Sequence, residues 1–312
     1  MRYCLMIEPQ QGLSYADQLA LARRAESLGF EAFFRSDHYE SFPGDAGRAT
    51  TDAWAVLAGL ARETSTIRLG SLVSPVTFRH AGAFAKVVAT VQAMSGGRME
   101  VGVGAGWHEQ EHRRHGVPFP EIGERADMLE ETLTIMRGLW QEPDGWSFDG
   151  AHWSVADALF RPRPDPVPPL IVGGTGTPRS YRLAARWADE FNLTSTEPGK
   201  VAAAFTKIDE ACRAIGRDPS TLRRSAMVGV LVGRDSGEVS RRTADLMAGF
   251  GATGSADAWF AEHEPRWIYG TPAEARARAD EFAAAGVGRI MLQDFIPLDL
   301  DHLDVMAEAL FV

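Results

Sequence analysis

The chain has 312 residues, of which 45% are hydrophobic and 24% are charged, a composition typical of a globular protein. Its formal net charge of −10 argues against a nucleic-acid or anionic-membrane partner, because phosphate contacts need clustered Lys and Arg. The two cysteines, Cys4 and Cys212, have no metal-ligand spacing, so we expect neither a disulfide nor a metal site. No segment approaches about 18 consecutive apolar residues, and the N-terminus lacks an apolar leader. We therefore expect a cytoplasmic protein.

Strand-like apolar runs alternate with segments of helical periodicity along the chain. Ser14 caps the first predicted helix and Gly29 stops it. In chain order we predict strand 3–7, helix 14–28, strand 31–35, helix 52–63, strand 67–73, helix 82–94, strand 99–104, helix 124–140, strand 170–172, helix 178–187, strand 190–193, helix 201–215, strand 225–232, helix 272–285, strand 289–294 and a helix from 301.

Eight strand–helix units predict a parallel sheet with right-handed crossovers. Eight favour a closed (β/α)₈ TIM barrel over an open doubly wound sheet, which usually has fewer strands. The length could hold two domains, but barrels commonly use 250 or more residues (roughly) as one. We therefore predict a single α/β barrel domain over residues 1–312.

Two segments exceed a minimal barrel and are predicted as insertions after strands four and seven. Residues 141–168 contain WSFDGAHWSV, which predicts a small hairpin turning at Asp149-Gly150. Residues 233–270 carry Trp259, Phe260 and Trp267. Each insertion is either decoration of the barrel or a lid over its C-terminal face, and the sequence leaves both open.

Active sites of such barrels lie at the C-terminal ends of the strands. This rule selects the polar and glycine-rich stretches that follow the predicted strands: Glu8, Gln10, Gln11, residues 35–39, 71–82, 102–111 and 173–178, Asn192, Gln293 and Asp294.

The cluster Gly173-Gly174-Thr175-Gly176 leaves a strand and enters a helix at Thr177-Pro178. Free backbone N–H groups and the helix dipole favour an anion there, although a tight turn without a ligand would use the same residues. No Walker-type loop is present, and no G-x-G-x-x-G follows the first strand. Nucleoside-triphosphate and ordinary NAD sites are therefore disfavoured.

Asp37 and His38 place a carboxylate beside an imidazole at the mouth of the predicted barrel. Near neutral pH, a histidine can move protons or form a hydrogen bond with a polar ring. An Asp-His pair at a strand end can also have no role beyond capping a loop. His108, His112 and His115 lie on a stretch rich in Glu and Arg, for which we predict a solvated helix face and no metal site.

The segments FRSDH, IRLGSLVSPVTFRH, AKVVATVQAMSGGRMEVGVGAGW and IVGGTG…LAARWADEFN, in this order, resemble the bacterial luciferase-like monooxygenase superfamily. The similarity covers nearly the whole chain. Within the superfamily the chain is most similar to the F420-dependent oxidoreductases of actinobacteria, which use a deazaflavin. The resemblance also implies a (β/α)₈ barrel and admits a homodimer.

This resemblance implies an oxidoreductase that moves a hydride between the deazaflavin C5 and an organic substrate. One alternative is a monooxygenase of the same fold that uses reduced FMN and dioxygen. Another is a barrel that binds a flavin or deazaflavin without catalysis. The sequence does not name the substrate.

The resemblance assigns roles residue by residue. Asp37 and His38 match the pair near the polar edge of the ring, and Arg125 matches an arginine that contacts cofactor phosphate. A non-proline cis peptide against the ring corresponds to Ser71–Leu72. The remaining implied cofactor contacts are Gly104 and Gly106 beside the ring, and Gly173, Gly174, Thr175 and Gly176 in the phosphate loop.

Trp107 departs from one branch of the superfamily. The glucose-6-phosphate dehydrogenases have a catalytic glutamate after the glycine turn of the fourth strand, where this chain has Trp107. We therefore expect no sugar-phosphate oxidation by that mechanism and a more apolar substrate wall.

Overall fold

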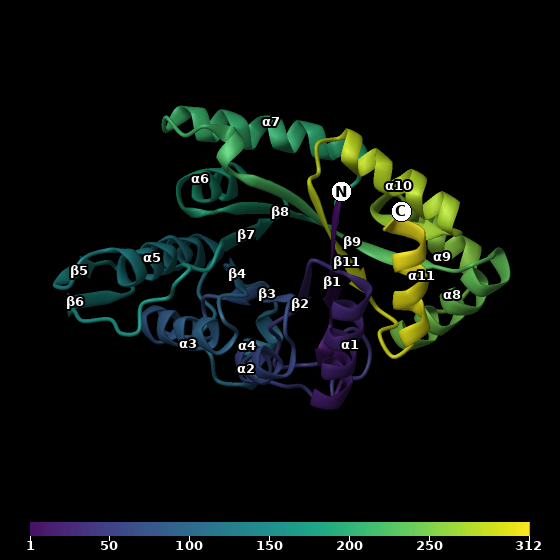
Figure 1. Ribbon diagram of the computed structural model, residues 1–312, viewed down its shortest axis with the longest axis horizontal. Helices are drawn as coiled ribbons and strands as arrows, with labels where there is room; N and C mark the ends of the chain where they lie inside the picture. The colour runs from purple at the N-terminus through teal and green to yellow at the C-terminus, as the bar shows by residue number, and fades with distance from the viewer. Residues whose placement is uncertain (312) are drawn as a thin grey trace.

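The computed structural model describes residues 1–311, apart from the side chains of Asp257 and Glu262. Eight parallel strands form a barrel that closes where the first strand pairs with the last, and helices surround it (Figure 1). The predicted (β/α)₈ barrel is therefore confirmed. The barrel strands are, in spatial order, β1 (Arg2–Ile7), β2 (Ala32–Arg35), β3 (Arg68–Pro75), β4 (Met99–Gly104), β7 (Leu170–Gly174), β8 (Glu190–Thr194), β9 (Arg223–Val232) and β11 (Arg289–Asp294).

The helices begin and end close to the predicted residues because the local capping signals are strong. Ser14 forms a capping box with Asp17, and Gly29 ends the first helix at a φ of 88°. The helices are α1 (Tyr15–Leu28), α2 (Ala53–Glu63), α3 (Ala81–Met94), α4 (Glu109–Arg114), α5 (Ile122–Gln141), α6 (Pro178–Trp187), α7 (Pro198–Ala214), α8 (Ser236–Phe250), α9 (Ala256–His263), α10 (Pro272–Ala284) and α11 (Leu300–Leu310), with short 3₁₀ turns at Pro9–Gln11, Pro219–Thr221 and Glu264–Arg266. Among the described residues, no helix is long and apolar enough to cross a membrane.

The first insertion contains the predicted hairpin, formed by the antiparallel strands β5 (Trp146–Asp149) and β6 (Ser154–Ala158). The hairpin lies beside α5 (Figure 1), where the carboxylate of Glu131 accepts hydrogen bonds from three successive backbone N–H groups of its turn. The ring of Trp146 packs so closely on α5 that a Cβ at Gly138 would lie 2.3 Å from it. This insertion decorates the outside of the barrel.

The second insertion contains α8, α9 and a ninth strand, β10 (Trp267–Gly270). β10 pairs in parallel with the C-terminal half of β9, beyond the point where β8 ends. Aromatic side chains of this insertion form a separate cluster together with Phe295. In it, Phe260 stacks on Tyr269 and Trp267 stacks on Phe295. Phe295 follows β11 and connects this cluster to the cavity described below.

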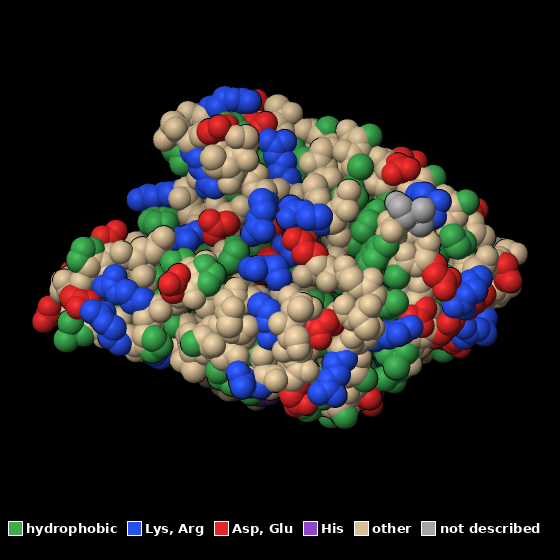
Figure 2. All heavy atoms as spheres, viewed as in Figure 1, with side chains coloured by type: hydrophobic (Ala, Val, Ile, Leu, Met, Phe, Trp, Pro, Cys, Tyr) green, Lys and Arg blue, Asp and Glu red, His purple; other side chains and the backbone are tan. Residues whose placement is uncertain are grey.

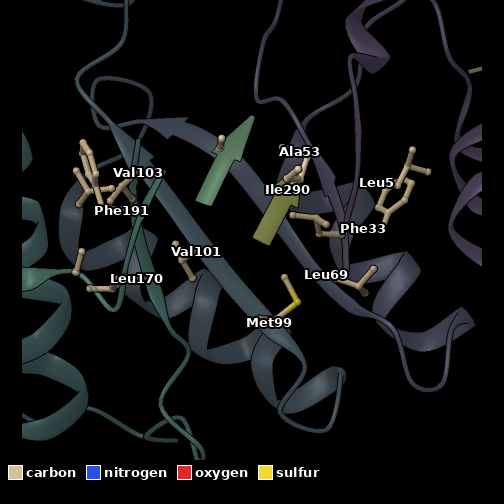
Figure 3. Packing of buried hydrophobic residues seen from close by; sticks show 14 of the residues in the cluster. Leu5, Phe33, Ala53, Leu69, Met99, Val101, Val103, Leu170, Phe191 and Ile290 are labelled. Carbon is tan, nitrogen blue, oxygen red and sulfur yellow. The ribbon is translucent and has the colours of Figure 1, made fainter. Parts of the chain in front are cut away.

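Side chains of the barrel strands alternate between two apolar layers, as a pleated strand requires. Cys4, Met6 and Phe34 point into the barrel with Leu72, Ile171, Met227 and Met291. The intervening residues pack outward against the helices, as Figure 3 shows for Leu5, Phe33, Leu69, Met99, Val101, Val103, Leu170, Phe191 and Ile290.

A buried ion network closes the N-terminal end of the barrel. Arg289 is fully buried and lies 2.6 Å from a Glu100 oxygen and 3.1 Å from a Glu190 oxygen, both carboxylates being buried too. Although burial alone would raise the pKa of Glu100, the guanidinium of Arg289 lowers it below its ordinary value. Figure 2 shows basic side chains gathered around the hollow of this face with acidic ones between them.

Removal of Arg289 should destabilise the fold strongly, because Glu100 and Glu190 lose the buried counter-ion that they share and keep only the partly exposed Arg68 and Arg223. We expect Arg289→Ala to lower the free energy of unfolding by about 3–5 kcal/mol in urea denaturation at neutral pH. Arg23→Ala, which removes an exposed ion pair with Glu63, should change it by less than about 1 kcal/mol. Equal small effects of the two substitutions would contradict the structural importance of the network.

Candidate functional site

A cavity of about 750 Å³ lies at the C-terminal ends of the barrel strands. All eight barrel strands, or the segments that follow them, contribute to its wall, as the barrel rule predicts. Its lining is mostly apolar, with a few polar groups that converge on it, which is typical of a small-molecule site. The predicted site residues that line it are His38, Leu72, Gly104, Gly106, Gly173, Gly174 and Thr175.

The end of β3 forms one wall of the cavity through a bulge at Leu72 and Val73. Pairing with β4 runs regularly to Ser71 and resumes at Ser74, with one extra residue on β3 between them. The Leu72–Val73 peptide is cis, so the expected cis bond at Ser71–Leu72 is wrong by one residue. Ser71 still pairs with Arg35 on one side and Val101 on the other, so the regular ladder extends past the expected position.

The glycines of two neighbouring strands leave room for this bulge. A Cβ at Gly104 would lie 2.7 Å from one Val73 methyl carbon, and a Cβ at Gly173 would lie 3.1 Å from the other. A Cβ at Gly102, also on β4, would lie 2.4 Å from the Ser71 carbonyl oxygen and clash with it. The glycine-rich ends of β4 and β7 therefore have a packing role in addition to any ligand contact.

Asp37 is buried behind the cavity wall and does not line it. Its carboxylate accepts hydrogen bonds from Arg79 at 2.5 Å and from the Ser74 hydroxyl at 2.7 Å. Burial alone would lower the pKa of Arg79, but Asp37 and Asp52 raise it above its ordinary value. Asp37 thus ties the end of β2 to the bulge of β3 through a charged pair. Ser71 lies in the same layer, with its hydroxyl 3.0 Å from that of Ser74.

His38 does line the cavity, and its partner is Glu111 instead of Asp37. The Nδ1 atom of His38 lies 2.8 Å from one Glu111 oxygen, while the other oxygen accepts the Tyr39 backbone N–H at 3.0 Å. Because a carboxylate only accepts, Nδ1 carries the hydrogen, which leaves Nε2 for a ligand. Only 1% of the Glu111 side chain is exposed.

The prediction of a solvated helix face for the stretch around His112 is therefore wrong in part. α4 turns Glu111 and His112 inward, and His112 is fully buried with its Nε2 atom 2.7 Å from the Thr77 hydroxyl. Burial lowers the pKa of His112. The sequence did contain one indication that these side chains face the site: this helix directly follows the C-terminal end of β4. Among the described residues, no group of three or more His, Cys, Asp or Glu could hold a metal ion.

A second polar group lies in the cavity at the end of β1. Glu8 accepts hydrogen bonds from Gln293 at 2.6 Å and from Gln10 at 2.8 Å. The amide oxygen of Gln10 in turn accepts the Ser36 hydroxyl at 2.6 Å. These four residues line the cavity. Asn192 and Asp294, also selected by the strand-end rule, are buried elsewhere, and Asp294 pairs with His302.

The loop from β7 to α6 supplies the glycine-rich part of the wall. Gly173, Gly174 and Thr175 line the cavity, whereas Gly176 has a φ of 86° and packs beneath Tyr181. The lining continues onto the first turn of α6 with Thr177, Arg179 and Ser180. Arg179, which the sequence analysis missed, forms an ion pair with Asp127 of α5.

Arg125 lies on α5 but does not line the cavity. Its guanidinium stacks over the Phe119 ring at 3.7 Å and donates a hydrogen bond to the Pro120 carbonyl. Burial lowers its pKa. A phosphate contact by Arg125 stays a prediction, and it would require this side chain to leave Phe119.

Aromatic and aliphatic side chains form the mouth of the cavity. Trp107 is 65% exposed and Ile122 is 60% exposed, and both line the cavity. The Phe42 ring meets the Trp107 ring edge-on at 5.3 Å and the His38 ring at 4.6 Å. Trp107, which the sequence predicts as part of an apolar substrate wall, therefore faces the cavity.

Three known proteins show the relationships of this chain. An F420-dependent glucose-6-phosphate dehydrogenase of Microbacterium testaceum is 36% identical over 184 residues, which cover 59% of this chain and 53% of the relative. An F420-dependent secondary alcohol dehydrogenase, solved with an F420-acetone adduct, has a TM-score of 0.85 at 22% identity, covering 99% of this chain and 98% of its own. A type II Baeyer–Villiger monooxygenase from the CAM plasmid of Pseudomonas putida, solved with FMN, has a TM-score of 0.80 at 17% identity, covering 99% and 97%.

The two structural likenesses establish a shared fold. Family membership follows from the sequence itself, because the profile of the luciferase-like monooxygenase family matches residues 2–293. The chain belongs to the luciferase-like monooxygenase family of oxidoreductases.

Proposed function

We propose that this protein is an F420-dependent oxidoreductase that transfers a hydride between the deazaflavin C5 and a small organic substrate. One observation carries the proposal: the β3 bulge, His38 and the glycine-rich loop before α6 all face one cavity. The relative from Microbacterium testaceum, which is named as F420-dependent, supports the choice of cofactor.

The residues of the cavity fit a planar ring that carries an anionic side chain. Leu72, Val73 and Met227 supply an apolar surface for the ring. Gly173, Gly174 and Thr175 allow close backbone approach at the N-terminal end of α6, where the helix dipole favours phosphate. When bound, the deazaflavin supplies two-electron hydride chemistry.

The remaining predicted residues are assigned by where they lie. Gly104 and Gly106 border the ring position, whereas Ser71 and Gly176 support the wall from behind. Arg179 lines the cavity beside the glycine loop, so we assign it the phosphate contact in preference to Arg125.

His38 is proposed as the group that holds or moves a proton at the substrate. Glu111 keeps the hydrogen on Nδ1, so neutral His38 offers the Nε2 lone pair to a substrate hydroxyl. Protonated His38 offers an Nε2 hydrogen to a substrate carbonyl. Asp37 acts in this scheme as a positioning residue, because Arg79 and Ser74 occupy its carboxylate.

A reduced-FMN monooxygenase is the second candidate, supported by the FMN complex that shares the fold. The two differ in oxygen chemistry, because a deazaflavin lacks the flavin N5. A barrel that binds a flavin or deazaflavin without catalysis is the third candidate. The hydrogen bond by which Glu111 orients the His38 ring disfavours it.

Cofactor selectivity tests the proposal directly. Titration of the purified apoprotein with F420 and FMN, followed by fluorescence, should give saturable binding at least about tenfold tighter for F420, which corresponds to about 1.4 kcal/mol. Tighter binding of FMN, with no saturable signal for F420, would make the monooxygenase the better assignment.

His38→Ala should lower turnover of a substrate that the wild type accepts by about 10²–10⁴-fold, because it removes a positioned acid or base. F420 affinity and the thermal unfolding midpoint should change little. His152→Ala, in the hairpin outside the cavity lining, is the matched control and should retain full turnover. A His38 variant with near-wild-type turnover would remove this residue from the catalytic list.

Glu111→Ala should lower kcat by about 10- to 100-fold through loss of the orienting hydrogen bond. Glu111→Gln keeps an oxygen that can accept from Nδ1–H and should recover part of this loss. The Kd for F420 should be the same in both variants, because Glu111 does not line the cavity. Equal kcat values in the wild type and the alanine variant would show that His38 is oriented without Glu111.

A further inference from the structure

Arg79 holds the residues on both sides of His38. It lies between β3 and α3, and its guanidinium, with 14% of the side chain exposed, reaches the end of β2. One of its nitrogens donates to the Asp37 carboxylate at 2.5 Å, and another donates to the Tyr39 hydroxyl at 3.1 Å. Because Asp37 and Tyr39 are the chain neighbours of His38, the backbone that carries His38 is held from two directions.

The same carboxylate connects Arg79 to the bulge of β3. Asp37 is fully buried and also accepts the Ser74 hydroxyl at 2.7 Å. Ser74 is the residue at which regular pairing with β4 resumes, directly after the two bulge residues that line the cavity. Arg79 is therefore linked, through Asp37, to the cavity wall as well as to the end of β2.

A third contact joins Arg79 to the N-terminal end of α2. One oxygen of Asp52 caps this helix by accepting the backbone N–H groups of Trp54 and Ala55. The other oxygen pairs with Arg79 and accepts the Tyr39 hydroxyl at 3.0 Å. A guanidinium presents several donors in a planar fork, whereas an ammonium group is a point charge, so this set of partners suits an arginine.

The ion pair of Asp37 depends on Arg79. Arg35 is buried in the same region, but its guanidinium donates to neutral oxygens, among them the Thr51 carbonyl at 2.9 Å. Without Arg79, the donor that remains to the Asp37 carboxylate among the described residues is the Ser74 hydroxyl. A buried carboxylate that loses its cation is unfavourable, so we expect Asp37 to move toward water and to displace the residue that follows it.

We infer that Arg79 is a positioning residue of the site, which fixes His38 where Glu111 can orient its ring and aligns it with the wall of the β3 bulge. Arg79 does not line the cavity and acts through Asp37 and Tyr39. The inference rests on the proposed function for the task of His38, whereas the orientation of His38 is measurable without cofactor or substrate.

The test follows the ring nitrogens of His38 by NMR in apoprotein labelled with nitrogen-15 histidine. The chain has eight histidines, and the His38 signals are identified by their loss in His38→Ala. At mildly alkaline pH, the wild type should show one tautomer with the hydrogen on Nδ1, because Glu111 accepts it there. Arg79→Met should move the two nitrogen shifts toward each other, because His38 then exchanges between tautomers.

Two control variants separate positioning from general stability. Arg137→Met removes an arginine that is 15% exposed and pairs with Asp189, beside the hollow at the opposite end of the barrel. Asp52→Asn keeps an oxygen that can cap α2 but removes the charge that Arg79 contacts there. Both variants should keep the wild-type His38 signals. An equal change in Arg137→Met, or in Asp52→Asn, overturns the inference, because the effect would then come from stability or from α2.

Arg79→Lys keeps the inference testable if Arg79→Met does not fold. A lysine supplies one charge to Asp37 but has no fork that reaches Tyr39 and Asp52 as well, so the His38 signals should move in the same direction by less. Wild-type His38 signals in the variant that folds overturn the inference. Failure of both variants to fold assigns Arg79 to the fold instead of the site and overturns it too.

Turnover is the second readout. With F420 and a substrate that the wild type accepts, Arg79→Met should lower kcat by up to about 100-fold, because a small displacement of a reacting group is enough. Arg137→Met should keep the wild-type kcat. A wild-type kcat in Arg79→Met overturns the part that Arg79 plays in the reaction. Failure of F420 to bind the wild type counts against the proposed function alone, because the His38 spectra of the apoprotein still decide the inference.

Discussion

The extra residue in β3 is the constraint on which the shape of the site depends. It pushes Leu72 and Val73 out of the regular ladder and toward the cavity, while Ser71 and Ser74 remain paired with β4. A Cβ at Gly104 on β4 would clash with Val73, and one at Gly173 on β7 would crowd it. A feature of one strand thus determines the residue types of two others, and the glycines do not have to be explained by a ligand alone.

The bulge is held in place from the side of β2. Ser74 donates to Asp37, and Asp37 pairs with Arg79 from the segment that follows β3. The next residue, His38, then projects into the cavity, where Glu111 fixes its ring from α4. Adjacent residues therefore differ in their surroundings: Asp37 is held by Ser74 and Arg79, whereas His38 faces the cavity.

The sequence predicted the elements well because their signals are local. The Ser14 cap, the Gly29 stop and the alternation of strands and helices are readable within a few residues. The same signals located the cavity, since a barrel places all strand ends on one face. The pairing of His38 with Glu111 was missed because these residues are 73 positions apart and meet only after β2 and β4 align. The cis bond was predicted one residue too early, because the family resemblance gave only its region. The regular pairing of Ser71 with β2 and β4, which puts the bulge after Ser71, is visible only in the structure.

The two ends of the barrel handle charge in opposite ways, and this difference bears on function. At the N-terminal end, Arg289 neutralises Glu100 and Glu190 inside the protein, so the end is sealed by internal pairs. At the C-terminal end, Glu8 accepts from the amides of Gln10 and Gln293, and Glu111 accepts from the Tyr39 backbone N–H and pairs with His38. Carboxylates kept in this way repel anions but can orient and polarise neutral donors and acceptors. Arg179 stands on the first turn of α6 and lines the same cavity, and the helix dipole there favours an anion, so under the proposed function the anionic part of the cofactor would lie beside α6.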